Sequence, residues 1–423
     1  MSALRFCWSL LALLLAPLHP LCAGMSHDTP MEHQLETEFD PALPRSFLNN
    51  DREFMEVRPV GFNSRSYYDA NGVYKGTDNI ANWERYALGY WWETHRLYSS
   101  CSMEPTGIAT HADWALMVPC MFGDSAKLPR VIFVHNYMLP HFIESTLKFM
   151  HENASFVLLS GGTDLTIPRS ALDARYHLLR GFSQNKDGGS YFQRLVNDPR
   201  LIHWYCENHD LLHPKLSTLP TGFTMDNMYR DPLAWAPQNY TLLDQRPLQF
   251  LVSDRVRDGR GQWADRARAV KLCAEMGAKG WDYCLQPSEK GLQDGVSHDA
   301  FVSLLSSVPL VACVHGGGVD PSPKAWESIL VGSIPIVQRL TIGDSYAHLP
   351  VAFVDDWAQL LDPPDEAALQ QLLQGWVREL GPYYVPGSEL RRKTIDKLKT
   401  AYWMEQVRHR IQEHDLEHGR GGG

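Results

Sequence analysis

The feature that most constrains the fold of this chain is a rhythm of short apolar runs that alternate with helix-like segments. Short continuous apolar runs are typical of strands that are buried on both faces of a parallel sheet. One series of these runs lies within 130–219 and a second within 248–354. The rhythm therefore predicts an α/β fold with two Rossmann-like domains that face a central cleft.

The two series predict particular elements. In the first series we expect a helix at 141–152 and strands at 130–134, 155–159, 202–206 and 215–219. In the second series we expect helices at 263–277, 297–307 and 323–330, and strands at 248–252, 309–314, 334–337 and 351–354.

Changes in composition predict the remaining organisation. Residues 1–24 combine a basic start with a short apolar run, the pattern of a signal peptide or signal anchor, and 25–60 is an acidic, proline-broken stem. An N-terminal α/β domain is expected at 61–240, a C-terminal Rossmann-like domain at 241–405, and a polar, glycine-rich tail at 406–423. The leader predicts a protein of the ER or Golgi lumen or a secreted one, attached to a membrane only if the leader is retained.

Charge and composition exclude some classes of protein. The formal net charge of −10 argues against a nucleic-acid partner, because binding to polyphosphate needs a basic face. Hydrophobic residues make up 44% and charged residues 21%, which is normal for a globular enzyme and excludes a disordered chain. Acceptor triplets for N-glycosylation begin at Asn153 and Asn239, in agreement with a lumenal route.

The cysteines fit the same compartment. Two of the eight lie in the leader, and the even remainder permits disulfides in a lumenal protein. The close pairs Cys101/Cys120 and Cys273/Cys284 are the candidates.

The segment Cys313–Val337 says most about a ligand. Its strand leads into Gly316, Gly317 and Gly318, whose missing Cβ atoms would let backbone N–H groups approach an anion. A helix is expected to begin just after this loop, with Lys324 in its first turn, where a positive charge is unfavourable unless an anion compensates it. The spacing predicts a diphosphate site. The alternative is a plain strand–turn–helix crossover, which is common in α/β proteins.

The same segment continues with Glu327, one turn after Lys324, which is placed to accept hydrogen bonds from two ribose hydroxyls. The whole segment resembles the nucleotide-binding lobe of the exostosin-like glycosyltransferases, which have the GT-B architecture. Glu327 follows Trp326 as in the family's Trp-Glu pair, and Gly332–Pro335 is similar to its Gly-x-Ile-Pro.

Three positions depart from the family pattern. Lys324 stands where the family has arginine, and Pro323 where it often has histidine. Asp320 lies one residue further from Trp326 than the family's aspartate. A lysine offers a point charge instead of the planar fork of an arginine. Weaker similarity extends the resemblance over roughly 130–405.

The resemblance implies an activity. It implies inverting transfer of a hexosyl or pentosyl group from a nucleotide sugar, expected to be a UDP-sugar, to a hydroxyl of a glycan or glycoprotein. The general base would lie in the first lobe, where Asp164 and His135 are the candidates, although a capping role for Asp164 is equally open. Arg266 is nearest in pattern to a family arginine expected at the donor phosphates. No Asp-x-Asp motif occurs, so no protein-bound metal and no cofactor are expected.

Two other functions are open. A lumenal or secreted carbohydrate-binding protein without turnover would fit the lysine at 324 and the shifted Asp320. A hydrolase is disfavoured because no Gly-x-Ser-x-Gly elbow occurs. His209, Asp210 and His213 could form a triad or a metal set, but with 18 histidines in the chain ordinary roles are favoured.

Overall fold

The structure is a computed structural model, and all of the residues that it describes belong to one compact unit. The predicted leader and stem and the Cys101/Cys120 pair lie outside these residues. The described residues are 107–116, 121–123, 128–139, 142–147, 150–162, 166–168, 191–223, 240–254, 264–287, 296–316, 318–321, 323–361 and 363–420.

The first sheet of the described chain has six strands in the order β2-β1-β3-β4-β5-β6. Neighbouring strands are parallel except for the antiparallel pair β1 and β2. Every residue of β3 and β4 is buried, which explains their continuous apolar runs and confirms the expected strands of this series. The bounds are β1 Trp114–Leu116, β2 Met121–Gly123, β3 Val131–His135, β4 Phe156–Gly161, β5 Leu201–Cys206 and β6 Leu216–Thr218.

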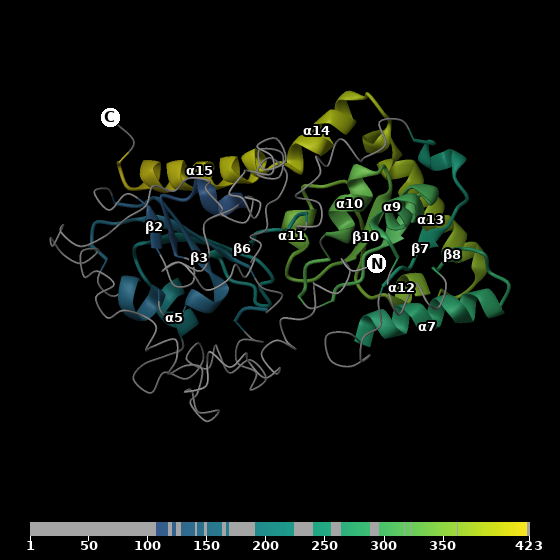
Figure 1. The fold of residues 1–423 in the computed structure, drawn as a ribbon, viewed down its shortest axis with the longest axis horizontal. Helices are drawn as coiled ribbons and strands as arrows, with labels where there is room; N and C mark the ends of the chain where they lie inside the picture. Colours follow the sequence, from purple (N-terminus) through teal and green to yellow (C-terminus); the bar gives the residue numbers. More distant parts are fainter. Residues whose placement is uncertain are drawn as a thin grey trace, which may run out of the picture. The chain divides into compact units, whose positions relative to one another are not determined.

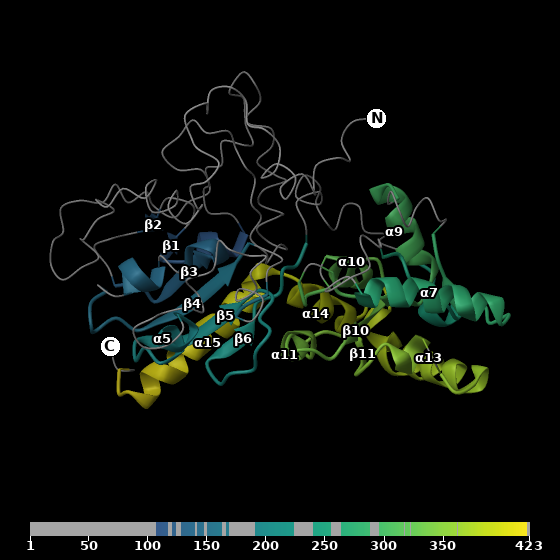
Figure 2. The same cartoon turned by 90° about the horizontal axis from the view of Figure 1, so that it is seen from below.

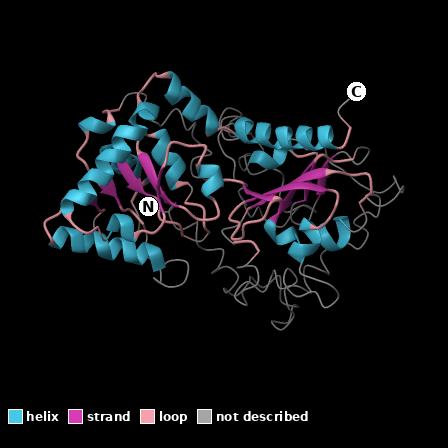
Figure 3. Cartoon of the chain, turned by 180° about the vertical axis from the view of Figure 1, so that it is seen from behind, coloured by secondary structure: helices cyan, strands magenta, loops and turns pink. Residues whose placement is uncertain are grey.

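Helices cover both faces of the first sheet. Helices α5 (Tyr191–Val196) and α15 (Thr400–Glu417) lie on opposite faces (Figures 1 and 3). Three short helical segments are η4 (Gly107–His111), η5 (Asn136–Met138) and η6 (Phe142–Leu147). The helix expected at 141–152 is therefore shorter than predicted, because the chain turns at 152–153 ahead of β4.

The second sheet of the described chain is parallel throughout and has the order β11-β10-β9-β7-β8. Numbered from 1 to 5 along the chain, the strands lie in the order 2-1-3-4-5. The second strand, β8, thus lies on one side of β7, and the third, β9, lies on the other side. The expected strands are confirmed, whereas β8 escaped prediction because its two residues are only partly buried and lie in no continuous apolar run. The bounds are β7 Phe250–Leu251, β8 Cys284–Leu285, β9 Leu310–Ala312, β10 Ile334–Gln338 and β11 Ala352–Val354.

Helices also flank the second sheet (Figure 3). The three expected helices are confirmed as α7 (Ala264–Ala278), α9 (His298–Ser307) and α10 (Lys324–Leu330). Helix α13 was not predicted, although Asp365 caps it by accepting the backbone N–H of Ala368 at 2.7 Å. The others are η10 (Leu243–Gln245), α11 (Gly343–Tyr346), α12 (Ala358–Leu361), α13 (Glu366–Leu380), η12 (Gly381–Tyr384) and α14 (Glu389–Lys397).

Helix α15 returns from the second sheet to the first. It runs along β4 and β5 and buries Trp403, Met404 and Val407 (Figure 2). Arg130 donates two hydrogen bonds from Nη2 to the carboxylate of Asp415, at 2.6 and 2.7 Å. The helix passes the boundary predicted at 405, so most of the segment expected to be a tail is helical.

Within the described part of the chain, no helix has both the length and the apolar character required to cross a bilayer.

A disulfide joins α7 to β8. Cys273 and Cys284 are bonded, with their Cα atoms 5.6 Å apart, which confirms one of the two predicted pairs. Cys206 and Cys313 are buried free thiols.

The disulfide is expected to stabilise the fold by restricting the unfolded chain. Replacing both residues by serine (Cys273→Ser with Cys284→Ser) should lower the free energy of unfolding by about 2–3 kcal/mol in denaturant titrations. Mass mapping of the unreduced wild type should recover the two peptides as a linked pair. Recovery of both cysteines as free thiols would contradict the assignment.

Candidate functional site

The strand order of the second sheet defines one point where a ligand is expected. In open parallel sheets, ligands bind beyond the carboxyl ends of the strands, where the strand order reverses. Here that point lies between β7 and β9. Ser253 and Asp254 follow β7, and His315 follows β9. Together with Arg266 of α7 and Lys324 of α10, these residues are called the switch-point cluster.

Asp254 is the centre of the switch-point cluster. Its side chain has no solvent exposure, and its Oδ1 atom pairs with both cations. Lys324 Nζ donates to Oδ1, and Arg266 Nε lies 3.4 Å from the same atom. The structure thus brings together two predicted phosphate ligands through a carboxylate that the sequence reasoning did not single out.

This pairing corrects the interpretation of Lys324. The unfavourable charge in the first turn of α10 was expected to await a diphosphate, but Asp254 already compensates it. Helix α10 is also short, with seven residues, so its own N-terminus contributes little. Any attraction for an anion at this point depends on the side chains of Lys324 and Arg266.

His315 and Arg266 of the switch-point cluster are in contact with each other. Arg266 Nε donates to the backbone carbonyl of His315 at 3.1 Å. His315 Nε2 lies 3.6 Å from Oδ2 of Asp265 in the first turn of α7. Burial lowers the pKa of His315, and the nearby Asp265 carboxylate opposes this shift. The imidazole is therefore neutral at neutral pH, with its proton favoured on Nε2, next to the carboxylate.

The glycine-rich loop is packed more tightly than expected. Gly316 is buried, and Gly317 lies outside the described residues. A Cβ atom at Gly318 would lie 2.0 Å from Asn208 Oδ1, so the missing side chain makes room for that amide. The same Asn208 oxygen accepts the backbone N–H of Asp320 at 2.9 Å. In this structure Gly318 serves the attachment of the loop to the end of β5.

Asp320 completes this attachment. Its Oδ2 accepts the backbone N–H of Thr221, which follows β6, at 2.8 Å. Its Oδ1 accepts the hydroxyl of Tyr346 in α11 at 2.7 Å. The aspartate that is displaced from the family pattern thus has a structural role in this chain.

Helix α10 places the predicted ribose ligand close to the cluster. Glu327 is buried. The pKa of the Cys313 thiol, just after β9, is influenced by the charge of Glu327 and by the charges of Lys324 and Asp254. Burial raises the pKa of Cys313 to about 12. Trp326, beside Glu327, has no exposure and packs edge-on against Phe223 with ring centres 5.8 Å apart.

The chain returns from α10 into β10 through Gly332, the glycine of the Gly-x-Ile-Pro segment. Gly332 has φ +86°, in the region that favours glycine. An added Cβ would also lie 2.3 Å from the ring of Tyr240, so a side chain at this position would have to displace that ring. Pro335 follows within β10, paired in register with Val311 of β9.

One of the two candidate bases, His135, lies at the carboxyl edge of the first sheet. His135 ends β3 with no exposure, beside Gly161 of β4 in register. Burial lowers the pKa of His135 to about 4, opposed by a hydrogen bond to the backbone of Gly162. Asp164, the other candidate, lies outside the described residues.

Sequence reasoning missed a buried carboxylate at the same edge. Glu207 follows β5, and its Oε2 atom accepts the backbone N–H of Gly162 at 2.7 Å. A Cβ at Gly161 would lie 2.4 Å from the carboxyl carbon of Glu207. The available signal was an acidic residue directly after a continuous apolar strand. Glu207 anchors the chain just before Asp164.

The histidines near Asp210 have ordinary roles. His209 Nε2 is 2.7 Å from Thr218 Oγ1, and Asp210 accepts the Thr166 hydroxyl at 2.6 Å. His213 packs edge-on against Phe192. No group of metal-ligating side chains occurs among the described residues.

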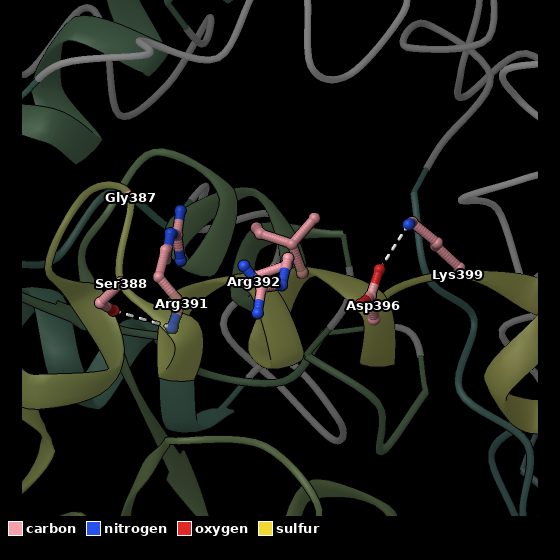
Figure 4. Close-up of a pocket in the computed structure, with 7 residues that line it drawn as sticks. Gly387, Ser388, Arg391, Arg392, Asp396 and Lys399 are labelled. Carbon is pink, nitrogen blue, oxygen red and sulfur yellow. Dashed lines mark hydrogen bonds and ion pairs between the residues drawn. The ribbon is translucent and has the colours of Figure 1, made fainter.

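A cavity of about 350 Å³ lies along one face of α14, apart from these segments (Figure 4). Its cations are largely engaged by the protein. Lys399 pairs with Asp396, and Arg391 lies between the rings of Tyr240 and Tyr384, with its guanidinium carbon 5.6 Å from each ring centre. These contacts fit a structural role for Arg391.

Comparisons with known proteins add little. No protein-family model and no curated protein matches the chain. Among solved structures it is similar to the E. coli trehalose-6-phosphate synthase bound with UDP-2-fluoro glucose, with 11% identity and TM-score 0.30 over 66% of this chain and 72% of that chain. It is also similar to the catalytic domain of Arabidopsis thaliana starch synthase IV bound to ADP and acarbose, with 12% identity and TM-score 0.29 over 68% and 74%. Similarity at this level carries no functional argument.

The ion pair of Lys324 should matter for stability. Lys324→Met leaves the buried Asp254 carboxylate with Arg266 alone, and we expect the free energy of unfolding to fall by about 3 kcal/mol. Lys324→Arg should lose less. The matched control is Lys271→Met, whose partner Glu275 is half exposed, and its effect should stay below about 0.5 kcal/mol. Equal losses in the two methionine variants would contradict the assignment.

The depressed pKa of His135 predicts a dependence of stability on pH. The unfolded chain takes up a proton near pH 6.5, whereas folded His135 does so near pH 4. His135 therefore contributes up to about 3 kcal/mol that is fully present above pH 6.5 and is lost as the pH falls toward 4. Denaturant titrations of His135→Gln should show a smaller decline over this range. The exposed His409→Gln serves as control and should keep the wild-type slope.

Proposed function

We propose that this chain is a glycosyltransferase that uses a nucleotide sugar, with UDP-sugars as the donor class. One observation carries the proposal. The segment that resembles the donor loop of exostosin-like enzymes leaves β9 at the reversal point of a parallel sheet, where such folds bind ligands. Lys324 and Arg266 meet there, and Glu327 lies on the helix that begins with Lys324.

The proposed reaction is an inverting transfer. An acceptor hydroxyl of a glycan or glycoprotein forms a bond to the anomeric carbon of the sugar while the bond from that carbon to the diphosphate oxygen breaks. The acceptor proton passes to a base of the first lobe, and the diphosphate leaves with the electron pair. Lys324 and Arg266 stabilise the charge on the leaving group, and Glu327 accepts hydrogen bonds from the ribose. The lack of an Asp-x-Asp motif supports a mechanism without a protein-bound metal.

Of the two candidate bases, Asp164 is favoured. His135 has no solvent exposure, and its ring is already engaged by a hydrogen bond to the backbone of Gly162. Asp164 follows two residues after Gly162, whose backbone N–H is held by Glu207. In the proposed enzyme, Glu207 positions the segment that carries the base. The secretory pathway is the proposed location, on the evidence of residues 1–24 alone.

A second function has a specific observation in its favour. Because Asp254 already neutralises Lys324, the cluster could serve a carbohydrate-binding protein without turnover. Such a protein would bind sugars and show no preference for nucleotides.

A panel of nucleoside diphosphates and nucleotide sugars tests the proposal by thermal shift and by release of nucleoside diphosphate. A ligand at 100 times its dissociation constant should add about 2.7 kcal/mol to the stability. Glu327→Gln should weaken nucleotide binding ~10-fold or more, because it loses charge-assisted hydrogen bonds to the ribose. Glu379→Gln, at an exposed position of α13, is the control. Sugar binding that ignores nucleotides would favour the alternative function.

A further inference from the structure

Three polar atoms of the switch-point cluster are buried and have no hydrogen-bond partner in the part of the chain that the structure describes. They are Ser253 Oγ, Asp254 Oδ2 and His315 Nδ1. A buried polar atom without a partner costs ~1–3 kcal/mol, and native proteins contain few of them. These three follow the two strands that border the reversal point. Their shared location indicates that a ligand supplies the missing partners.

The chemistry of the three atoms selects the kind of group that they would bind. Asp254 Oδ2 belongs to a carboxylate whose other oxygen contacts two cations, so it accepts hydrogen bonds and donates none. His315 Nδ1 is also an acceptor, because its ring is neutral and Nε2 faces Asp265. The Ser253 hydroxyl can donate or accept. Two acceptors and a hydroxyl match the hydroxyl groups of a sugar, whereas phosphate oxygens are acceptors themselves.

We infer that Asp254 divides the donor site between its two carboxylate oxygens. Oδ1 holds Lys324 and Arg266 for the diphosphate, and Oδ2, with Ser253 and His315, binds hydroxyl groups of the transferred sugar. This assignment rests on the proposed function and adds to it the residues that discriminate between donor sugars. Glu327 remains the ligand of the ribose, so the transferred sugar and the nucleoside are bound by different carboxylates.

Calorimetric titration with two probes tests the assignment. The probes are UDP and the UDP-sugar that stabilises the wild type most in the panel. Asp254→Asn keeps the shape and an oxygen for Lys324 but replaces the other oxygen with a donor. We expect the dissociation constant for the UDP-sugar to rise ~10-fold or more relative to that for UDP. Any change in the affinity for UDP itself reports on Lys324 and Arg266, which lose the Asp254 charge. Ser253→Ala should have the same selective effect and covers the case in which Asp254→Asn does not fold.

The control and the contrary outcomes are distinct. Asp282→Asn removes one exposed carboxylate just before β8, so it lies at the amino-terminal ends of the strands, away from the switch-point cluster at their carboxyl ends. This variant should leave both affinities unchanged. Equal weakening of UDP and UDP-sugar in the Asp254 and Ser253 variants would overturn the assignment and leave the proposed function standing. If neither UDP nor any UDP-sugar binds to the wild type, the proposed function is overturned, and this assignment with it.

Discussion

The buried carboxylate of Asp254 contacts cations from two different helices, and the geometry of the candidate site depends on these contacts. Arg266 comes from α7 and Lys324 from α10, so one oxygen atom ties both helices to the end of β7. Because the carboxylate has no access to water, each cation compensates a charge that the solvent cannot. The same contacts place Lys324 at the reversal point of the sheet, where a ligand is expected.

A second set of contacts holds the loop between β9 and α10. Asn208 fills the space beside Gly318 and accepts the N–H of Asp320, while the Asp320 carboxylate accepts from Thr221 and Tyr346. The loop is thus fixed from segments that follow β5 and β6 and from α11. A loop fixed in this way loses little freedom when a ligand binds, which favours affinity. Gly318 therefore has a packing role, beside the anion-binding role that the sequence predicts for the glycine-rich loop.

The two edges of the described sheets carry different chemistry. The first sheet presents a neutral histidine and a carboxylate that anchors a backbone turn, His135 and Glu207. The second sheet presents two cations paired with Asp254. Next to them lie buried polar atoms of Ser253, Asp254 and His315 that have no hydrogen-bond partner among the described residues.

Much of the fold could be predicted because strands buried on both faces are mostly apolar, as in the first four residues of β3 and of β4. Helix α13 was missed although Asp365 signals its start, and β8 was missed because its partly buried residues lie in no continuous apolar run. The sequence by itself determined the alternation of strands and helices and the glycine-rich segment with Lys324. Only the tertiary structure decided that Lys324 meets Asp254, 70 residues away. Their meeting depends on β9 pairing with β7, a long-range choice that no local pattern records.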